Sequence, residues 1–302
     1  MLNITGNKKV YLTISIVLML ISVVSLALQG FNLDTDFAGG MAVTYSVKGD
    51  FEVADIEAVV SEALGAKQKA SSVQKSEGSD VIIKFGYDNA LKTDEERANF
   101  AAEKIAAITS ALSAKYGEVE LKNQDVVSPS TGNELARSAI WMSILAALAI
   151  LVYITFRFEF FSGAVAVLAL VHDILILCGV YSVLQIAIDT NFIAALLTVL
   201  GYSINNTIVV FDRIRENTRH AKKQTYGEIA NASINQTIGR SINTTVTTLL
   251  TIVMVYILGV ASIKAFTLPI IIGIVIGTYS SIFGAGSVWA AWKDAGVKAK
   301  RA

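Results

Sequence analysis

The chain has 302 residues, of which 53% are hydrophobic and only 17% are charged, and its formal net charge is zero at pH 7. A soluble domain carries about a quarter charged residues, so this composition excludes an ordinary soluble protein. The zero net charge conceals an asymmetry, because residues 31–135 hold 18 of the 25 acidic residues but only 10 of the 25 basic ones. We therefore expect a membrane protein that carries one acidic, water-soluble module.

Six apolar segments have the length of about 20 residues that a helix needs to cross a membrane. They are Val10–Leu28, Ala139–Phe158, Phe160–Leu184, Ile188–Phe211, Ile242–Val260 and Phe266–Trp292. The first segment follows Lys8 and Lys9 but is longer than the apolar core of a cleaved signal, so we interpret it as an uncleaved anchor. The predicted fold class is an all-α membrane bundle of six transmembrane helices.

Short basic segments set the orientation of such a bundle. Basic residues precede the first span, separate the second from the third, follow the fourth and end the chain. Placing all four groups inside puts both termini in the cytoplasm and predicts a multi-pass protein of the cytoplasmic membrane. The expected parts are residues 1–30, an extracytoplasmic domain at 31–138, spans two to six at 139–292 with a cytoplasmic segment at 213–240, and a cytoplasmic tail at 293–302.

Hydrophobic patterns between the first two spans predict an inserted α+β domain with the order strand, helix, strand, strand, helix, strand. The strands are expected at Met41–Val47, Gln68–Lys75, Val81–Tyr87 and Val119–Val127, the turn at Glu77–Ser79, and the helices at Val53–Leu64 and Thr93–Tyr116. Thr93 and Glu96 have the spacing of a capping box, and Ser128–Gly132 is predicted to be a loop. Two helices on one face of an antiparallel sheet make a ferredoxin-like arrangement.

Polar residues inside spans are costly, so each needs a partner or a function. For Asp173 and the pair Asn205 and Asn206, a role in an ion pathway is at least as well supported as packing, and Arg240 lies at the mouth of span five. Interhelical packing is the expectation for the other polar or small residues in the spans. These are His172, Gly201, Ser203, Asn243, Thr244, Thr247, Thr248 and Thr251, with close helix approach expected at Gly201 and Ser203.

The cytoplasmic ends of spans four and five are expected to hold interfacial groups rather than a conduit. Asp212 and Arg213 are interpreted as ion pairs or anchors, and Ala221–Gly239 as a helix along the cytoplasmic face, with apolar side chains turned to the bilayer or the bundle. The chain has two histidines and one cysteine, too few for a convincing thiolate or imidazole metal site. We expect no metal, no cofactor and no enzymatic activity, because no nucleophile–base pair is visible.

Several of these runs together resemble the SecF family, membrane subunits of the bacterial Sec protein-export system within the RND superfamily. The runs are Asp34–Gly40, Leu170–Asp173, Gly201–Asn205, Val209–Asn217 and Asn235–Thr237 with Arg240 and Asn243. The resemblance covers the whole chain. It implies an RND-type half that pairs with SecD as a heterodimer, works beside the SecYEG channel on a translocating preprotein within membrane lipid, and binds no nucleic acid. It also implies that proton motive force drives movement of the exterior domain.

One position departs from the family pattern. The family has Asn-Asp where this chain has Asn205-Asn206, and that aspartate is a main candidate for proton carriage. Asn206 cannot titrate. SecD could supply the titrating carboxylate, Asp173 could serve, or this variant could use another ion or be uncoupled. The first explanation is favoured.

The run from Asp36 and Phe37 to Gly39 and Gly40 has a physical interpretation of its own. Two glycines permit a tight turn or a close backbone approach where the exterior domain leaves the first helix. A hinge and a plain structural turn are about equally well supported. As alternatives to a translocase subunit, an RND-type exporter half for lipids or small molecules, or a scaffold of the translocon, fits the same six spans.

Overall fold

The computed structural model of the chain describes residues 2–65, 70–76, 78–88, 91, 93–157, 159–221 and 223–301. Six helical segments in this part are long and apolar enough to cross a membrane, as predicted. They are α1 (Lys8–Leu28), α5 (Pro129–Arg157), α6 (Phe160–Leu184), α7 (Thr190–His220), α8 (Tyr226–Leu258) and a last segment that runs through α9 (Ala261–Tyr279), η1 (Ser280–Ala285) and α10 (Gly286–Arg301). Phe158, the predicted end of span two, lies outside the described residues.

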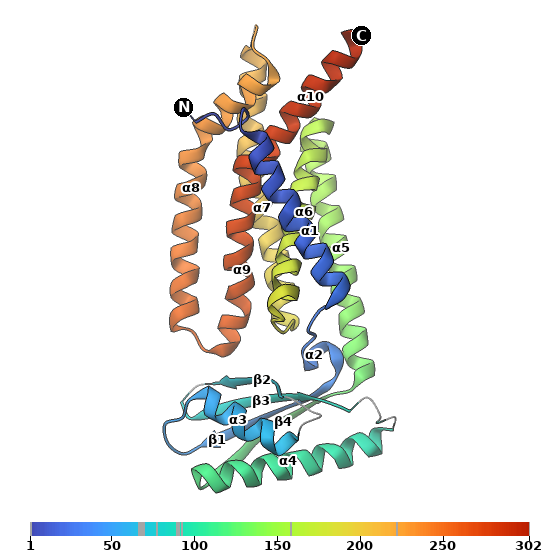
Figure 1. The fold of residues 1–302 in the computed structure, drawn as a ribbon, viewed down its shortest axis with the longest axis vertical. Coiled ribbons are helices and arrows are strands. Elements are labelled where there is room, and N and C mark those ends of the chain that lie inside the picture. The colour runs from blue at the N-terminus through green and yellow to red at the C-terminus, as the bar shows by residue number, and fades with distance from the viewer. Residues whose placement is uncertain are drawn as a thin grey trace.

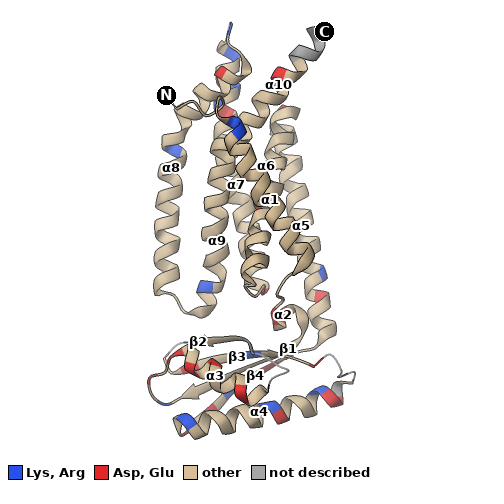
Figure 2. Ribbon diagram, viewed as in Figure 1, with Lys and Arg blue, Asp and Glu red and all other residues tan. Residues whose placement is uncertain are grey.

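The two ends of the bundle differ. Both chain ends lie at one end of the bundle, here named the terminal end, and a small sheet domain lies at the opposite end, named the domain end (Figure 1). Lys, Arg, Asp and Glu gather on the sheet domain and at the terminal end, whereas the middle of the bundle is almost free of them (Figure 2). This distribution is what an apolar solvent around the spans requires.

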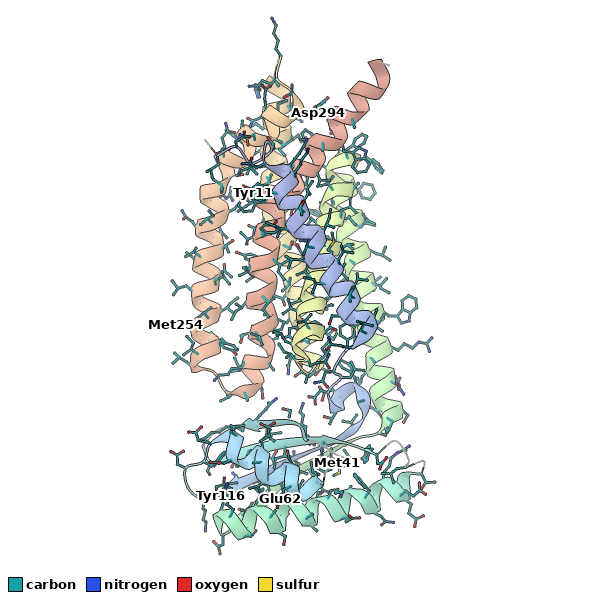
Figure 3. All side chains as sticks on the ribbon, in the orientation of Figure 1. Tyr11, Met41, Glu62, Tyr116, Met254 and Asp294 are labelled. Atoms are coloured by element: carbon teal, nitrogen blue, oxygen red, sulfur yellow. The ribbon has the colours of Figure 1, made fainter. Side chains whose placement is uncertain are left out.

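The sheet domain contains β1 (Gly40–Val47), α3 (Val53–Leu64), β2 (Ala70–Lys75), β3 (Asp80–Gly86), α4 (Asp94–Tyr116) and β4 (Val119–Val127). The strand order is β2-β3-β1-β4, and every neighbouring pair is antiparallel. Alternate side chains of β1 and β3, among them Met41 (labelled in Figure 3), pack on the apolar faces of α3 and α4. The predicted element order and the Thr93–Glu96 capping box are therefore confirmed. Gln68, Lys69 and Glu77 of the predicted strand and turn lie outside the described residues.

Two connections differ from the predictions. The expected loop Ser128–Gly132 is wrong, because α5 begins at Pro129, one residue after Ser128. Proline suits the first helical position, where its missing N–H needs no intrahelical partner. The expected cytoplasmic helix is not separate either, since α8 continues from it into span five. Ile229 and Ile234 are buried against the bundle, which is one of the two orientations expected for the apolar side chains of this segment.

Glycines allow α7 and α9 to approach closely. A Cβ built on Gly273 would lie 2.4 Å from the Val199 side chain, and one on Gly277 would lie 2.9 Å from that of Ser203. Gly201, where close approach was expected, has open space around its Cβ position and lies on the exposed face of α7. Small residues at an interface are the usual means of close helix packing in membranes, and here α9 supplies them.

Candidate functional site

A buried carboxylate lies near the middle of α6. Asp173 is only 1% exposed. Its Oδ2 accepts hydrogen bonds from Ser203 Oγ of α7 at 2.5 Å and from Ser280 Oγ of η1 at 2.9 Å. Its Oδ1 lies 2.8 Å from Nδ1 of His172, the preceding residue. Three groups from three segments therefore satisfy Asp173 inside this chain.

The π-helical segment η1 brings Ser280 to this carboxylate. π-helical turns are rare and occur frequently at functional sites. In the same turn, Ser281 Oγ lies 2.8 Å from Thr207 Oγ1 of α7. Of these two consecutive serines, Ser280 therefore contacts α6 and Ser281 contacts α7. The contribution of Ser280 was not predicted from the sequence, although the run Thr278–Ser281 is a polar interruption of an otherwise apolar span. This polar run is the sequence feature that indicates a functional contact in the last span.

Asn205 and Asn206 point to different environments. Asn206 is 3% exposed, and its Nδ2 is buried without a hydrogen-bond partner among the described residues. An unpaired buried amide donor is costly. Asn205 lies on the exposed face of α7. The structure therefore separates the two residues that the sequence placed together, with only Asn206 inside the bundle beside the Asp173 cluster.

A small cavity adjoins the Asp173 cluster. Its volume is about 240 Å³, and it lies between α1, α6 and the last span. Ser15, His172 and Ser280 are the polar residues of its wall. His172 Nε2 is buried and has no partner among the described residues. The cavity is large enough for several water molecules.

The exposed faces of α7 and α8 carry polar side chains within the spans. On α7 they include Thr198 and Asn205, and on α8 they include Arg240, Asn243 and Thr247. The outer side of α8, with Met254, projects away from the bundle without a neighbouring helix (Figure 3). We name the side formed by Thr198, Gly201, Asn205, Arg240, Asn243 and Thr247 the polar face.

Three threonines of α8 bond within their own helix, and a different one joins α8 to α9. Thr247, Thr248 and Thr251 donate to carbonyl groups one turn back in their own helix. Thr245 is the residue that reaches α9, because its Oγ1 lies 2.9 Å from Thr278 Oγ1. For Thr248 and Thr251 the prediction that they connect neighbouring helices is therefore wrong within this chain.

The terminal end of α7 holds the boundary groups. Arg213 donates from Nη1 to Glu216 Oε2 at 2.6 Å and from Nε to Gln236 Oε1 of α8 at 2.6 Å. Asn217 also donates to Gln236 and to Ser233. Asp212 is exposed on the same helix. Arg213 thus pairs locally, and these contacts fasten α7 to α8.

The glycine-rich run forms the junction between the sheet domain and the bundle. Phe37, in the short helix α2 (Thr35–Ala38), is 4% exposed and belongs to the bundle core. Gly39 has φ +80°, and a Cβ there would lie 2.8 Å from the backbone of Pro129. A Cβ on Gly40 would lie 2.5 Å from the carbonyl oxygen of Phe85. Both glycines are required by the expected close backbone approach, whereas the choice between a hinge and a plain structural turn stays a prediction.

Ionic contacts reinforce this junction. Lys84 of β3 donates to Asp34 Oδ2 at 2.6 Å, and its Nζ lies 3.6 Å from Asp36 Oδ1. Asp36 Oδ2 accepts from the backbone N–H and hydroxyl of Thr190, the first residue of α7. Burial by itself would lower the pKa of Lys84. The net effect is a raised pKa, because the hydrogen bond to Asp34 and the negative charges of Asp34, Asp36 and Asp189 outweigh the effect of burial. The sheet, α2 and α7 therefore meet at one charged cluster.

Within the described residues, no group of three or more His, Cys, Asp or Glu side chains could hold a metal ion. The geometry defines a class of protein: a polytopic membrane protein with a buried polar centre, a polar face and a sheet domain inserted after the first span. The family model for "Protein export membrane protein SecD/SecF, C-terminal" matches residues 107–295.

Relatives and solved structures agree with this match. The protein translocase subunit SecF of Sebaldella termitidis is 37% identical over 286 residues, which cover 93% of this chain and 89% of that protein. The protein translocase subunit SecDF of Thermus thermophilus is 35% identical over 271 residues, which cover 88% of this chain and 35% of that protein. The crystal structure of SecDF from that organism superposes with a TM-score of 0.78 at 32% identity, over 97% of this chain and 39% of that chain. The chain belongs to the SecF family of protein translocase subunits.

Proposed function

We propose that this chain is an accessory subunit of the Sec translocase that uses an ion gradient to assist protein translocation, and that a SecD-type half docks on its polar face. The observation that carries the proposal is that the polar face, which includes Asn205, Arg240 and Asn243, is exposed within the spans. Amides that face hydrocarbon are costly, and the exposed Arg240 lies beside them at the mouth of span five, so a protein partner is expected to cover this face. The similar SecDF protein, of which this chain matches only about a third, supports a SecD-type partner.

Contacts between α7 and α8 show that the polar face is continuous. Arg213 bonds Gln236, Asn217 bonds Ser233, and Tyr202 donates to Thr245 at 3.5 Å. This antiparallel register places Asn205 close to the level of Asn243. Arg240 lies about one helical turn from that level toward the terminal end. One partner helix could therefore contact both the amides and the guanidinium.

The titrating carboxylate belongs to the partner in this proposal. Asp173 is satisfied by Ser203, Ser280 and His172 inside the chain, and Asn206 has no ionisable group. Arg240 is an exposed cation on the polar face, and a guanidinium pairs readily with a carboxylate. A partner carboxylate opposite Arg240 could exchange this ion pair for a proton, and each charge moved through 100 mV supplies about 2.3 kcal/mol.

The remaining parts follow the same proposal. Basic residues at the terminal end favour a cytoplasmic location for both termini in the cytoplasmic membrane, which puts the sheet domain outside. Its strand order and antiparallel pairing support a ferredoxin-like arrangement. The SecYEG channel, the translocating preprotein and membrane lipid are the further partners. The role is transport rather than enzymatic catalysis, and the exporter alternative is not favoured because the relatives named above are translocase subunits.

Gradient-driven translocation in vesicles tests the assignment. We expect Arg240→Gln to abolish the stimulation of translocation by an imposed ion gradient while leaving gradient-independent translocation unchanged. Arg215→Gln, which removes an exposed cation of α7 at the terminal end, is the matched control and should retain the stimulation. Equal stimulation in wild type and Arg240→Gln would refute the role of Arg240, and the absence of stimulation in wild type would support the scaffold alternative.

Crosslinking tests the docking surface separately. Asn243→Cys in a Cys178→Ser background should crosslink to a cysteine in the SecD-type half. Leu168→Cys, on the exposed surface of α6, should not. A crosslink from position 168 but not from position 243 would place the partner elsewhere.

A further inference from the structure

An apolar groove lies between α5 and the rest of the bundle in the half near the sheet domain. Its volume is about 460 Å³, and none of its lining residues carries a charge. α5 contributes residues from Ala136 to Ala147, α6 contributes Ile174 and Cys178, and α7 contributes residues from Phe192 to Leu200. The groove is independent of the Asp173 cluster and of the polar face.

α5 packs closely on the bundle near its two ends and only sparsely between them, where Ala139 is buried in the bundle core. Near the sheet domain, a Cβ on Gly132 would lie 2.6 Å from the carbonyl oxygen of Phe37. Near the terminal end, Ile154 is 1% exposed, and a Cβ built on Gly163 of α6 would lie 3.5 Å from the Ile154 side chain. The intervening part of α5 is largely exposed (Figure 3).

The surroundings identify the occupant. The mouth of the groove carries exposed apolar side chains, among them Phe31, Ile140 and Ile144, and the exposed residues that continue along α5 are also apolar. A partner half is not expected here. With 3.6 residues per helical turn, the α7 residues of the polar face and those of the groove point in roughly opposite directions. A dry apolar cavity of about 150 Å³ holds one benzene ring, so this groove suits a chain of on the order of 18 carbons.

We infer that the groove binds an acyl chain of a phospholipid from the leaflet nearest the sheet domain. The chain fills the space between α5 and α7, where an empty apolar void would be destabilising. Because α5 begins two residues after β4 ends, the bound chain also supports the helix that leads to the sheet domain. The exclusion of a partner half from the groove rests on the docking surface of the proposed function, whereas the uncharged lining and the volume of the groove do not.

Photocrosslinking tests the site in the whole chain, assembled with its partner half in nanodiscs. The probe is a phosphatidylglycerol with a photoreactive group in its acyl chain. We expect crosslinks in residues 136–147 and 192–200 to exceed those on the exposed apolar surface of α8 several-fold. Ala147→Phe, which fills the groove, should remove this excess, and Ala149→Phe, which adds the same ring on the exposed side of α5, should retain it. An even distribution along all exposed spans, or no effect of Ala147→Phe, would overturn the inference.

A second measurement needs no substitution. Cys178 lines the groove and is the single cysteine of the chain, so its alkylation by an uncharged maleimide reports whether the groove is filled. We expect added phospholipid to slow alkylation of lipid-depleted protein several-fold. A rate that does not change with lipid would count against an acyl chain there.

Discussion

Asp173→Asn separates a structural role of the buried carboxylate from proton carriage. The substitution keeps the shape of the side chain and removes its charge. Ser203, Ser280 and His172 lie 2.5, 2.9 and 2.8 Å from the carboxylate oxygens. A hydrogen bond to a charged group contributes about 1.5–3 kcal/mol, and a neutral one contributes about 0.5–1.5 kcal/mol. Weakening three contacts by about 1 kcal/mol each should lower the free energy of unfolding by about 3 kcal/mol.

Gradient-driven translocation should nevertheless survive, because we assign the titrating carboxylate to the partner. The rate should change by less than about threefold, as judged in vesicles after correction for the amount of folded protein. Unfolding in bicelles provides that correction and checks the predicted loss of stability. A loss of gradient-driven translocation beyond about tenfold in well-folded protein would refute the assignment and identify Asp173 as the carrier.

Three further substitutions concern the sheet domain. Gly39→Val places a Cβ 2.8 Å from the Pro129 backbone at φ +80°. If the glycine-rich run is a hinge, this variant should insert into the membrane but should no longer move its sheet domain between different positions relative to the bundle, as measured by single-molecule fluorescence. Unchanged movement would exclude a hinge. Lys84→Met leaves the buried Asp34 carboxylate without its cationic partner, so the sheet domain should lose about 3–5 kcal/mol of stability. The control Lys122→Met, at the more exposed ion pair with Asp80, should cost at most about 1 kcal/mol. Because the pKa of Lys84 is raised above its ordinary value of 10.5, its stabilisation should be complete at neutral pH and disappear only as pH rises through that raised value. Thr93→Ala, which removes the cap of α4, should cost about 1 kcal/mol in thermal unfolding, and no change would show that the cap is redundant.

The strands and spans could be predicted because their burial follows a simple period. Alternate residues of β1 and β3 face one core, and the spans are apolar over the length of a bilayer. The helix start at Pro129 was missed because proline, serine and glycine are typical of both loops and helix N-termini. Local sequence does not distinguish these cases when the following helix is a span.

The candidate site was predictable only in part. The sequence identified Asp173 and the asparagine pair, but it could not tell which asparagine faces inward. Adjacent residues of a helix differ by about 100° in direction, so the answer depends on where α6 and η1 pack. Ser280 was missed for the same reason, since its contact with Asp173 depends on a π-helical turn that no hydrophobic period indicates.

A final prediction concerns how the polar face and the sheet domain communicate. α7 carries Asn205 on the polar face, and its first residue, Thr190, donates twice to Asp36. Beside it, Asp34 donates its backbone N–H to the carbonyl oxygen of Ile188. A rigid helix that is held at the junction can transmit a displacement from one end to the other.

Asp36→Ala removes the acceptor that joins α2 to the start of α7. We expect this variant to bind its SecD-type partner normally, because the polar face is untouched, but to lose the dependence of sheet-domain position on the ion gradient. Fluorescence transfer between the sheet domain and the terminal end measures that dependence, and crosslinking at position 243 measures partner binding. Asp50→Ala, at an exposed pair with Lys75 away from the junction, is the control and should behave as wild type. If Asp36→Ala still moved its sheet domain with the gradient, transmission would have to run through α1 or α5, which also connect the sheet domain to the bundle.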